Sequence, residues 1–235
     1  MRIPKKKKIP FLFKFIYRLD RLFPILSNRK KLSFFLDMSW AFEWLSLEYS
    51  LKVYKESEHP RLKELKPFLK KHISPECTVV DFGCSTGSMA NFYADFCKQV
   101  VAIDFVEEDI IQAKKRYKRK NLEFVYADAY HYLESNQLKF DVLLFAHVVG
   151  YFEKPFEVFK RFKPFFNKIF IEVPDFDCMY SNHYRRIEKR DLIFMDNNYV
   201  HEFNREEILE EVEKAGLKVI DKEFRYGQIR IWCQC

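Results

Sequence analysis

The residues best suited to chemistry in this sequence lie around a loop that contains two glycines, Gly83 and Gly87. Residues 78–82, before the loop, are mostly β-branched or aromatic and predict a strand, and the run that begins at Ser88 predicts a helix. Glycine lets a backbone turn tightly and approach a ligand, and a helix N-terminus attracts polar ligand groups. The loop therefore predicts a ligand site where the strand meets the helix.

Acidic side chains accompany this loop. Asp81 precedes it, and Asp104 ends the next predicted strand, twenty-one residues after Gly83. A carboxylate at that place can accept both hydroxyls of a ribose. Asp128 follows the third predicted strand, where it could accept an adenine amino group. The alternatives are that Asp104 caps the following helix and that Asp128 caps a turn. Together the acids predict a nucleoside-containing ligand.

The loop also permits a second interpretation, a serine hydrolase. It reads G-C-S-T-G and so satisfies G-x-S-x-G, in which Ser85 would be the nucleophile, and Asp175 or Asp196 and then His201 follow in the order of a triad. However, only predicted helices precede the first strand, no H-G-G-G-like oxyanion loop is found, and a hydrolase has no use for the acids described above. A dinucleotide dehydrogenase fits less well still, because Ser88 stands at the third glycine of its motif.

A sheet must position these residues, and the sequence after Pro75 predicts one. The predicted strands are residues 78–82, 100–104, 122–126, 140–146, 169–173, 217–223 and 228–233. Predicted helices alternate with them at residues 88–98, 107–119, 155–162 and 205–215. This alternation predicts an α/β fold with a doubly wound, mostly parallel sheet. The last two strands have no helix between them and predict one antiparallel hairpin.

Residues from about 62 to 235 resemble the class I S-adenosylmethionine-dependent methyltransferases. Residues 81–87, D-F-G-C-S-T-G, match the D/E-x-G-x-G-x-G motif of that family except that Ser85 replaces its middle glycine. Residues 126–129, Y-A-D-A, and 140–148, F-D-V-L-L-F-A-H-V, are similar to later motifs. The resemblance implies a Rossmann-like sheet of seven strands with one antiparallel strand near the C-terminus, and S-adenosylmethionine as the cofactor. The residues that it assigns to the cofactor are Asp81, Gly83, Cys84, Ser85, Gly87, Asp104, Phe105, Asp128, Ala129 and His147.

The predicted acceptor side departs from the family. Residues 199–208, Y-V-H-E-F-N-R-E-E-I, resemble the family's H-V-R-E-F-T-x-x-E-L segment, but Tyr199 and His201 replace its histidine and arginine. Residues 148–151, V-V-G-Y, replace V-L-E-H after the fourth strand. The identity of the acceptor is therefore not carried over from the resemblance.

Methyl transfer to a hydroxyl requires a group that takes up a proton. The candidates near the predicted pocket are His201, His147, Tyr151 and Tyr199, of which His201 is our first choice. A structural, hydrogen-bonded histidine is the alternative role for each histidine. Residues 174–203, which include His183, are predicted to form a lid over the substrate.

We therefore expect a methyltransferase acting on an oxygen atom of a small-molecule, lipid-linked or glycan acceptor. An RNA or protein methyltransferase and a non-catalytic cofactor-binding scaffold are the alternatives. The fourth strand is followed neither by an N-P-P-Y-like segment nor by a cysteine nucleophile, which argues against transfer to nucleobases. We expect no metal, because the sequence has no cluster of acidic or asparagine residues typical of a metal site.

The N-terminal residues differ in charge from the rest of the chain. The 235 residues have a net charge of +7, but residues 1–31 contain eleven Lys and Arg and one acid, so they carry +10 and residues 32–235 carry −3. Apolar residues between Pro10 and Pro24 recur at helical spacing and predict an amphipathic helix. We expect residues 1–31 to form a basic arm that binds an anionic membrane surface, with nucleic acid binding or packing on the domain as alternatives.

The remaining N-terminal residues, 32–75, are predicted to form a helical cap region, and residues 76–235 the methyltransferase domain. The six cysteines form no C-x-x-C pair, which suits reduced intracellular thiols. Neither a convincing secretory signal nor an uninterrupted apolar run of about 18–20 residues is found. We therefore expect a cytoplasmic protein that touches a membrane surface.

Overall fold

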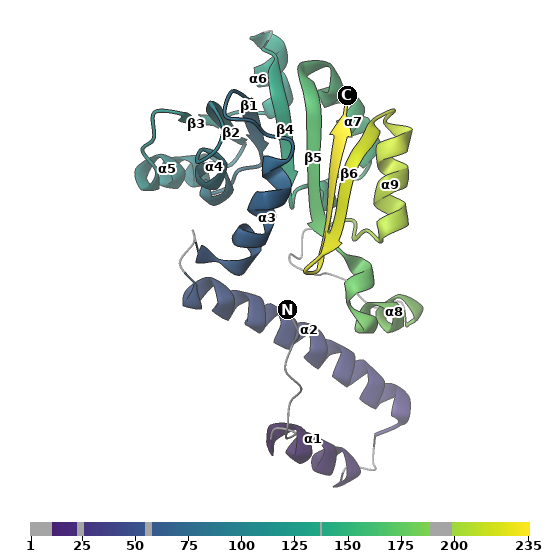
Figure 1. Cartoon of the computed structure of the whole chain (residues 1–235). Helices are drawn as coiled ribbons and strands as arrows, with labels where there is room; N and C mark the ends of the chain where they lie inside the picture. The colour runs from purple at the N-terminus through teal and green to yellow at the C-terminus, as the bar shows by residue number, and fades with distance from the viewer. Residues whose placement is uncertain (1–10, 23–25, 55–57, 137, 189–198) are drawn as a thin grey trace. The chain divides into compact units, whose positions relative to one another are not determined.

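The computed structural model describes residues 11–22, 26–54, 58–136, 138–188 and 199–235 (Figure 1). It divides into two compact units, residues 1–43 and residues 44–235, and the division falls inside one helix. The predicted lid residues 189–198 and the predicted hydrolase residue Asp196 lie outside the described residues.

The larger unit is built on a seven-stranded sheet with the order β3-β2-β1-β4-β5-β7-β6. Its strands are β1 Thr78–Phe82, β2 Gln99–Asp104, β3 Leu122–Tyr126, β4 Phe140–Ala146, β5 Phe166–Pro174, β6 Lys218–Arg225 and β7 Gln228–Gln234. The first five strands pair in parallel, and β7 runs antiparallel to both β5 and β6. The predicted mostly parallel sheet with one antiparallel strand near the C-terminus is confirmed.

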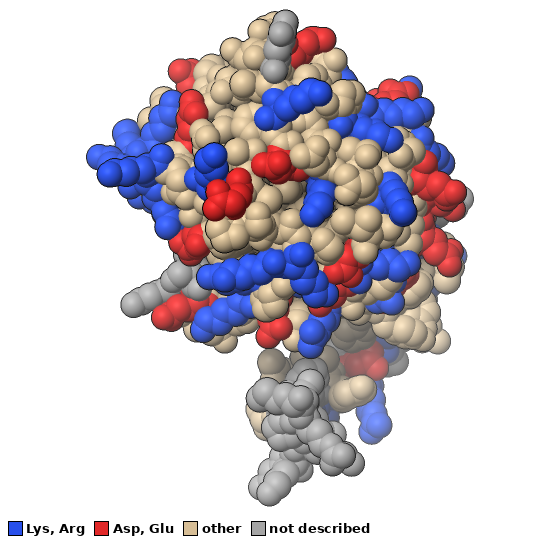
Figure 2. All heavy atoms as spheres, turned by 45° about the horizontal axis from the view of Figure 1, so that its top comes forward, with Lys and Arg blue, Asp and Glu red and all other residues tan. Residues whose placement is uncertain are grey.

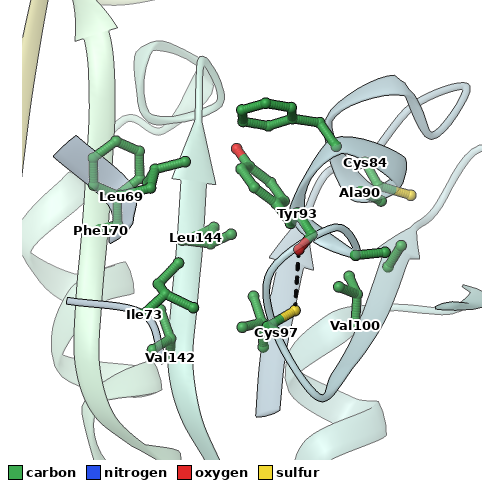
Figure 3. Packing of buried hydrophobic residues seen from close by; sticks show 14 of the residues in the cluster. Leu69, Ile73, Cys84, Ala90, Tyr93, Cys97, Val100, Val142, Leu144 and Phe170 are labelled. Atoms are coloured by element: carbon green, nitrogen blue, oxygen red, sulfur yellow. Dashed lines mark hydrogen bonds between the residues drawn. The ribbon is translucent and has the colours of Figure 1, made fainter. Parts of the chain in front are cut away.

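Helices cover both faces of the sheet. The helices of this unit that follow α2 (Asn28–Val53) are α3 Pro60–Lys70, α4 Ser88–Tyr93, α5 Glu107–Arg116, α6 Ala129–Ser135, α7 Pro155–Phe162, α8 Tyr180–Ile187 and α9 Arg205–Lys214. On one face, side chains of α3, α4 and α5 pack with Phe170 and Trp232 of the sheet. On the other face, α6, α7 and α9 pack around Phe145 and Ile171. Figure 3 shows part of the first core, where Leu69 of α3 lies beside Phe170.

The helices differ from the prediction in several places, and the predicted helix 107–119 already ends at Arg116. The predicted helix 88–98 ends at Tyr93, because the chain turns back toward β2 and Lys98 N–H donates to the carbonyl of Cys77 (2.9 Å). In the same turn the Cys97 thiol donates to the Tyr93 carbonyl (3.2 Å). Helices α6 and α8 were not predicted. Both are short, and tertiary packing stabilises such helices more than local propensity does.

The smaller unit contains α1, Phe11–Leu22, and the first part of α2, Asn28–Val53. Lys31 at the start of α2 pairs with Asp20 of α1, with Nζ 2.9 Å from Oδ1. None of the helices in the described residues has the length and apolar character needed to cross a membrane.

Replacing Phe145 with alanine should lower the free energy of unfolding by about 3–5 kcal/mol, because truncating a packed ring leaves a cavity. Phe145 is fully buried, and its ring contacts those of Phe82, Phe159 and Phe162. The matched control is Phe105→Ala, since that ring is 75% exposed. We expect a change within about 0.5 kcal/mol for the control. Urea denaturation followed by tryptophan fluorescence measures both, and equal losses for the two variants would contradict the described packing.

Candidate cofactor and acceptor site

The glycine loop lies at the edge of the sheet where the parallel strands end. Its first residues fold over the end of β2, since the backbone N–H groups of Gly83 and Cys84 both donate to the carbonyl of Ile103 (2.9 and 3.2 Å). Parallel strands end at one common edge, so the ends of β1, β2, β3 and β4 also lie there. Ligand sites of open α/β sheets occupy this edge.

Two of the loop positions require glycine. Gly83 has φ +69°, and a Cβ there would lie 2.7 Å from Val148 Cγ1. Gly87 has φ +84°, and a Cβ there would lie 2.5 Å from the Phe124 ring. The middle glycine position of the motif holds Ser85, whose φ of +45° is unusual for a residue with a side chain. Two hydrogen bonds compensate for this conformation: Ser85 N–H donates to Asp104 Oδ2 (2.7 Å), and its hydroxyl donates to Asp109 Oδ2 (2.9 Å).

These contacts also remove support for the hydrolase. The Ser85 hydroxyl faces Asp109 and not a histidine. Asp175 accepts two hydrogen bonds from the guanidinium of Arg205 (3.0 and 2.8 Å), and His201 Nε2 lies 2.9 Å from the carbonyl oxygen of Glu153. Among the described residues, the predicted serine, acid and histidine therefore do not form a triad.

Asp104 is buried at the end of β2, where it joins the loop to the following segment. Its Oδ2 accepts from Ser85 N–H, and its Oδ1 accepts from Val106 N–H (2.9 Å). Val106 is the N-cap residue of α5, so Asp104 orders the entry to that helix without being its cap. Each carboxylate oxygen has a second lone pair, which leaves Asp104 able to accept ligand hydroxyls as well. The assignment of Asp104 to the ribose stays a prediction.

Asp128 and Phe105 occupy neighbouring strand ends. Asp128 caps α6, because its Oδ1 accepts from His131 N–H (2.8 Å), and it is exposed. Asp128 thus caps a helix and not the turn that was the alternative, and its contact with adenine stays a prediction. Ala129 is buried in the first turn of α6. The Phe105 ring projects into solvent beside them, as a ring that stacks on a base would.

Asp81 is buried on the first face of the sheet. Its Oδ2 has no hydrogen-bond partner among the described residues. Burial, and then the charge of Asp104, raise the pKa of its carboxyl to about 8. An unpaired buried carboxyl is costly, and a positive ligand group beside it would favour its ionised form. A cationic ligand group beside Asp81 would therefore be stabilising, and the assignment of Asp81 to the cofactor stays a prediction.

The sequence interpretation missed a buried ionic cluster near the end of β4. It consists of Arg61 on α3, Glu172 on β5 and Arg230 on β7, and we call it the Arg–Glu–Arg cluster. Glu172 is fully buried and accepts from Arg61 Nη2 (2.7 Å) and from Arg230 Nε (2.9 Å). Burial alone would raise the pKa of Glu172, but the neighbouring charges, that of Arg61 foremost, lower it to about 2. Glu172 therefore stays ionised at neutral pH.

One signal for this cluster was present in the sequence. Glu172 and Arg230 each interrupt a predicted buried strand, and a charge in such a strand usually requires a partner. The register pairs these two residues directly across β5 and β7. Arg61 is 111 residues from Glu172, so only the fold brings it there.

His147 lies against this cluster. It follows β4 with φ +61°, and its Nε2 is 3.6 Å from Glu172 Oε2. Burial, and then the charge of Arg61, lower the pKa of His147 to about 3, which makes it neutral at physiological pH and a weak base. The Tyr199 hydroxyl donates to the His147 carbonyl (2.8 Å).

The two segments that depart from the family lie against each other. The N–H groups of Val200 and His201 donate to the Gly150 carbonyl (2.9 and 3.0 Å), and the rings of Tyr151 and Tyr199 pack edge to face with centroids 4.5 Å apart. His201 itself is bound to the Glu153 carbonyl, which leaves only its Nδ1 for other contacts. The structure thus brings His147, Tyr151 and Tyr199 together and turns the Nε2 of His201 to the backbone.

A pocket of about 360 Å³ opens beside Arg61. Its walls include Leu47 and Leu51 of α2, Leu62 of α3 and Met89 of α4. The pocket therefore combines apolar walls with two guanidinium groups, those of Arg61 and Arg116. The described residues contain no group of three or more His, Cys, Asp or Glu side chains arranged to hold a metal ion, and all six cysteines are free.

A sequence model of the family described as Methyltransferase domain matches residues 53–222. The chain belongs to this family. It is an S-adenosylmethionine-dependent methyltransferase, and S-adenosylmethionine is its cofactor. The resemblance noted in the sequence is thereby confirmed.

Solved structures share the fold of this methyltransferase. An S-adenosylmethionine-dependent methyltransferase from Archaeoglobus fulgidus has a TM-score of 0.54 and 15% identity, covering 74% of this chain and 92% of that one. Another from Aquifex aeolicus has a TM-score of 0.55 and 16% identity, covering 77% and 98%. Magnesium protoporphyrin IX methyltransferase from Synechocystis PCC 6803 with bound S-adenosylhomocysteine has a TM-score of 0.57 and 12% identity, covering 74% and 81%. At these identities the likeness is one of fold.

One curated relative matches a short segment. The methyltransferase is 39% identical over 66 residues to malonyl-(acyl-carrier protein) O-methyltransferase 2 of Coxiella burnetii (strain RSA 493 / Nine Mile phase I). The match covers 27% of this chain and 26% of that protein, about a quarter of the relative's length.

The loop residues of the methyltransferase fit its cofactor. The two required glycines let the loop lie close against Val148 and the Phe124 ring, and the unpaired oxygen of Asp81 suits a positively charged ligand. Asp104 has lone pairs for the ribose, and the exposed ring of Phe105 can cover the adenine. When bound, S-adenosylmethionine supplies a methyl group that its sulfonium makes electrophilic.

Replacing Asp104 with alanine should weaken the binding of S-adenosylhomocysteine by about 10- to 100-fold, because about 1.5–3 kcal/mol of hydrogen bonding to a charged group is lost. Isothermal titration calorimetry measures the change, and circular dichroism checks the fold. The control is Asp109→Asn, which alters the other acid bound to Ser85 and should leave affinity nearly unchanged. Full affinity in Asp104→Ala would contradict the assigned role.

The affinity for S-adenosylmethionine should rise with pH up to about pH 8 and then level off. In the free protein the Asp81 carboxyl has its pKa raised to about 8, so it is protonated at neutral pH. A bound cation favours the carboxylate, so binding releases a proton. Calorimetry on both sides of pH 8, in two buffers of different ionisation enthalpy, measures this release. The Asp81→Asn variant should bind more weakly and without this pH dependence; an unchanged profile in the variant would refute the role of Asp81.

Proposed function

We propose that the enzyme methylates an oxygen atom of a small-molecule, lipid-linked or glycan acceptor, and that this oxygen belongs to a carboxylate. The observation that carries the proposal is the Arg–Glu–Arg cluster beside His147. Its two arginines retain buried N–H donors, and its carboxylate Glu172 and the neighbouring His147 both hold a proton only weakly.

The free donors are Arg61 Nε and Arg230 Nη2, which are buried and have no hydrogen-bond partner among the described residues. A buried donor of a charged group without a partner is costly, so a ligand acceptor at this place would be stabilising. A carboxylate only accepts hydrogen bonds, and its geometry matches a guanidinium. The free donors therefore support an acidic acceptor.

The proton requirement supports the same acceptor. A hydroxyl must lose its proton during methylation, but at neutral pH His147, with a pKa of about 3, and Glu172, with a pKa of about 2, bind a proton too weakly to remove one efficiently. A carboxylic acid, with a pKa of about 4, is already ionised at neutral pH. In this proposal His147 is a neutral neighbour that positions the acceptor and is not the base that the sequence suggested. Tyr151 and His201 likewise need take up no proton.

The pocket beside Arg61 supports an acid with an apolar chain, because Leu47, Leu51 and Met89 line its walls. The matched segment of malonyl-(acyl-carrier protein) O-methyltransferase 2 is consistent with transfer to oxygen, although it covers only 26% of that protein. We place the reaction in the cytoplasm, at a membrane surface. The six free cysteines, of which Cys84, Cys97 and Cys233 are buried as thiols, support a reducing compartment.

The test uses S-adenosylmethionine with a tritiated methyl group and separate pools of lipids, small molecules, glycans, RNA and protein. We expect label in the lipid or small-molecule pool that mild alkali releases as volatile methanol, because methyl esters hydrolyse under those conditions while ethers and methylamines do not. Alkali-stable label would refute the carboxylate. Label confined to RNA or protein would favour an RNA or protein methyltransferase. Cofactor binding without label in any pool would favour a non-catalytic scaffold.

Arg61→Met should lower kcat/KM for methyl transfer to the acceptor pool that takes up label by about 10- to 100-fold, which corresponds to about 1.5–3 kcal/mol. The affinity for S-adenosylhomocysteine should stay nearly constant, because Arg61 serves the acceptor in this proposal. Arg119→Met is the matched control, since Arg119 pairs with Asp95 on the surface (2.7 Å). An equal loss of cofactor affinity in Arg61→Met would instead assign Arg61 to the cofactor or the fold.

A further inference from the structure

We propose that the helical hairpin formed by α1 and the first part of α2 binds the surface of an anionic lipid bilayer. In this proposal the rings of Phe11 and Phe15 enter the interface between headgroups and acyl chains. The proposal does not depend on the acceptor and concerns the smaller unit alone.

The first observation is an exposed apolar face on α1. Phe11 is 81% exposed, Leu12 57% and Phe15 47%. Phe11 and Phe15 are one helical turn apart, and their rings stack with centroids 6.4 Å apart. Adjoining large apolar side chains exposed in this way mark a surface that binds something.

The second observation is that α2 occupies a different side of α1. Asp20 is bound by Lys31 of α2, whose Nζ also donates to the Asp20 backbone carbonyl (3.1 Å). Ile16 lines an apolar pocket of about 400 Å³ together with Phe35 and Phe42 of α2. The hairpin thus has internal contacts of its own, and these leave Phe11, Leu12 and Phe15 facing outward.

The third observation is the charge beside the apolar face. At about 100° per residue, Lys14, Arg18 and Arg21 fall within one arc of about 60° that adjoins Phe11. All three are exposed. Long basic side chains can extend from such a position into the headgroup layer while the rings lie deeper. Residues 5–8, which precede α1 in the sequence, are four further lysines.

The rest of the chain does not share this charge. Residues 32–235 carry a net charge of −3, and Figure 2 shows one face of the molecule on which Lys and Arg are interspersed with Asp and Glu. Attraction to an anionic surface would therefore come mainly from the N-terminal residues. Helix α1 has 12 residues and a length of about 18 Å, less than the roughly 30 Å of a bilayer core, so it would lie along the surface.

A bilayer fits these observations better than a nucleic acid. Phosphates attract basic side chains, but they give no reason for an outward aliphatic and aromatic face on the same helix. Interfacial helices combine an apolar face with a basic flank, and each basic residue near anionic lipid strengthens binding. We therefore assign the hairpin to anionic lipid.

The test is cosedimentation of the full-length protein with sucrose-loaded vesicles of equal parts phosphatidylcholine and phosphatidylglycerol. We expect binding to these vesicles and little binding to pure phosphatidylcholine. The variant Lys14→Gln/Arg18→Gln/Arg21→Gln should lower partitioning by about 100-fold. The variant Phe11→Ser/Leu12→Ser/Phe15→Ser should lower it by at least about 10-fold, because it removes the apolar anchor.

The matched control is Lys154→Gln/Lys160→Gln/Lys214→Gln, which removes the same charge from exposed positions of the larger unit and should bind like the unaltered protein. All variants should keep their affinity for S-adenosylhomocysteine, which shows that each is folded. Binding that survives the serine substitutions, or that falls equally in the control, would overturn the proposal. So would preferential binding to polyuridylate, or a dimer that the serine substitutions dissociate while vesicle binding is absent.

Discussion

The burial of Glu172 constrains much of the methyltransferase fold. A carboxylate removed from water is destabilising by several kcal/mol unless cations and hydrogen bonds compensate. Here Arg230 compensates from the neighbouring strand and Arg61 from α3, so that α3, β5 and β7 must all be in place together. Arg230 is also buried and donates to Glu223 of β6 (2.8 Å). The edge strand β6 must therefore also be in place for the charges to be compensated. Elements far apart in the sequence are thus linked through one carboxylate.

This constraint also explains why the cofactor residues and the ionic cluster share one face of the sheet. On that face two strands change from apolar to polar toward the end of the sheet that holds the loop: β1 from Val79 to Asp81 and β5 from Phe170 to Glu172. Strand β7 runs antiparallel to β5, so Arg230 lies opposite Glu172, nearer the loop, and Trp232 lies opposite Phe170. The apolar half anchors α3 and α4, and the polar half is left for ligands. A shift of one residue in any strand would move these carboxylates to the opposite face.

Local patterns in the sequence predicted the parts of the fold that depend on neighbouring residues. The strands, the glycine loop and the antiparallel hairpin follow from alternation and from turn residues within short windows. Helices α6 and α8 were missed because each is only seven or eight residues long, too short for a helical period to stand out in the sequence. The Arg–Glu–Arg cluster was missed because Arg61 and Glu172 meet only when the sheet has formed.

The protonation of His147 also could not be predicted from local sequence patterns. Its residue type suggested a base, but a pKa depends on what surrounds the ring, and burial beside Arg61 lowers it to about 3. The position of Asp81 followed from a motif, whereas its raised pKa follows from burial next to Asp104. Sequence patterns thus located Asp81 and His147 at the ends of their strands, and the fold determines the protonation of each.

Gly150 limits how the acceptor site can diverge. A Cβ at this position would lie 2.9 Å from the His201 carbonyl oxygen and 3.1 Å from the Tyr199 ring, so any other residue would separate the two segments that meet there. Gly83 is similarly restricted, because a Cβ at that position would lie 2.7 Å from Val148 Cγ1. In a lineage that acquires a new acceptor, substitutions would therefore accumulate at Tyr151 and in the pocket walls. Position 150 would remain glycine in such descendants, while the residues around it that contact the acceptor vary.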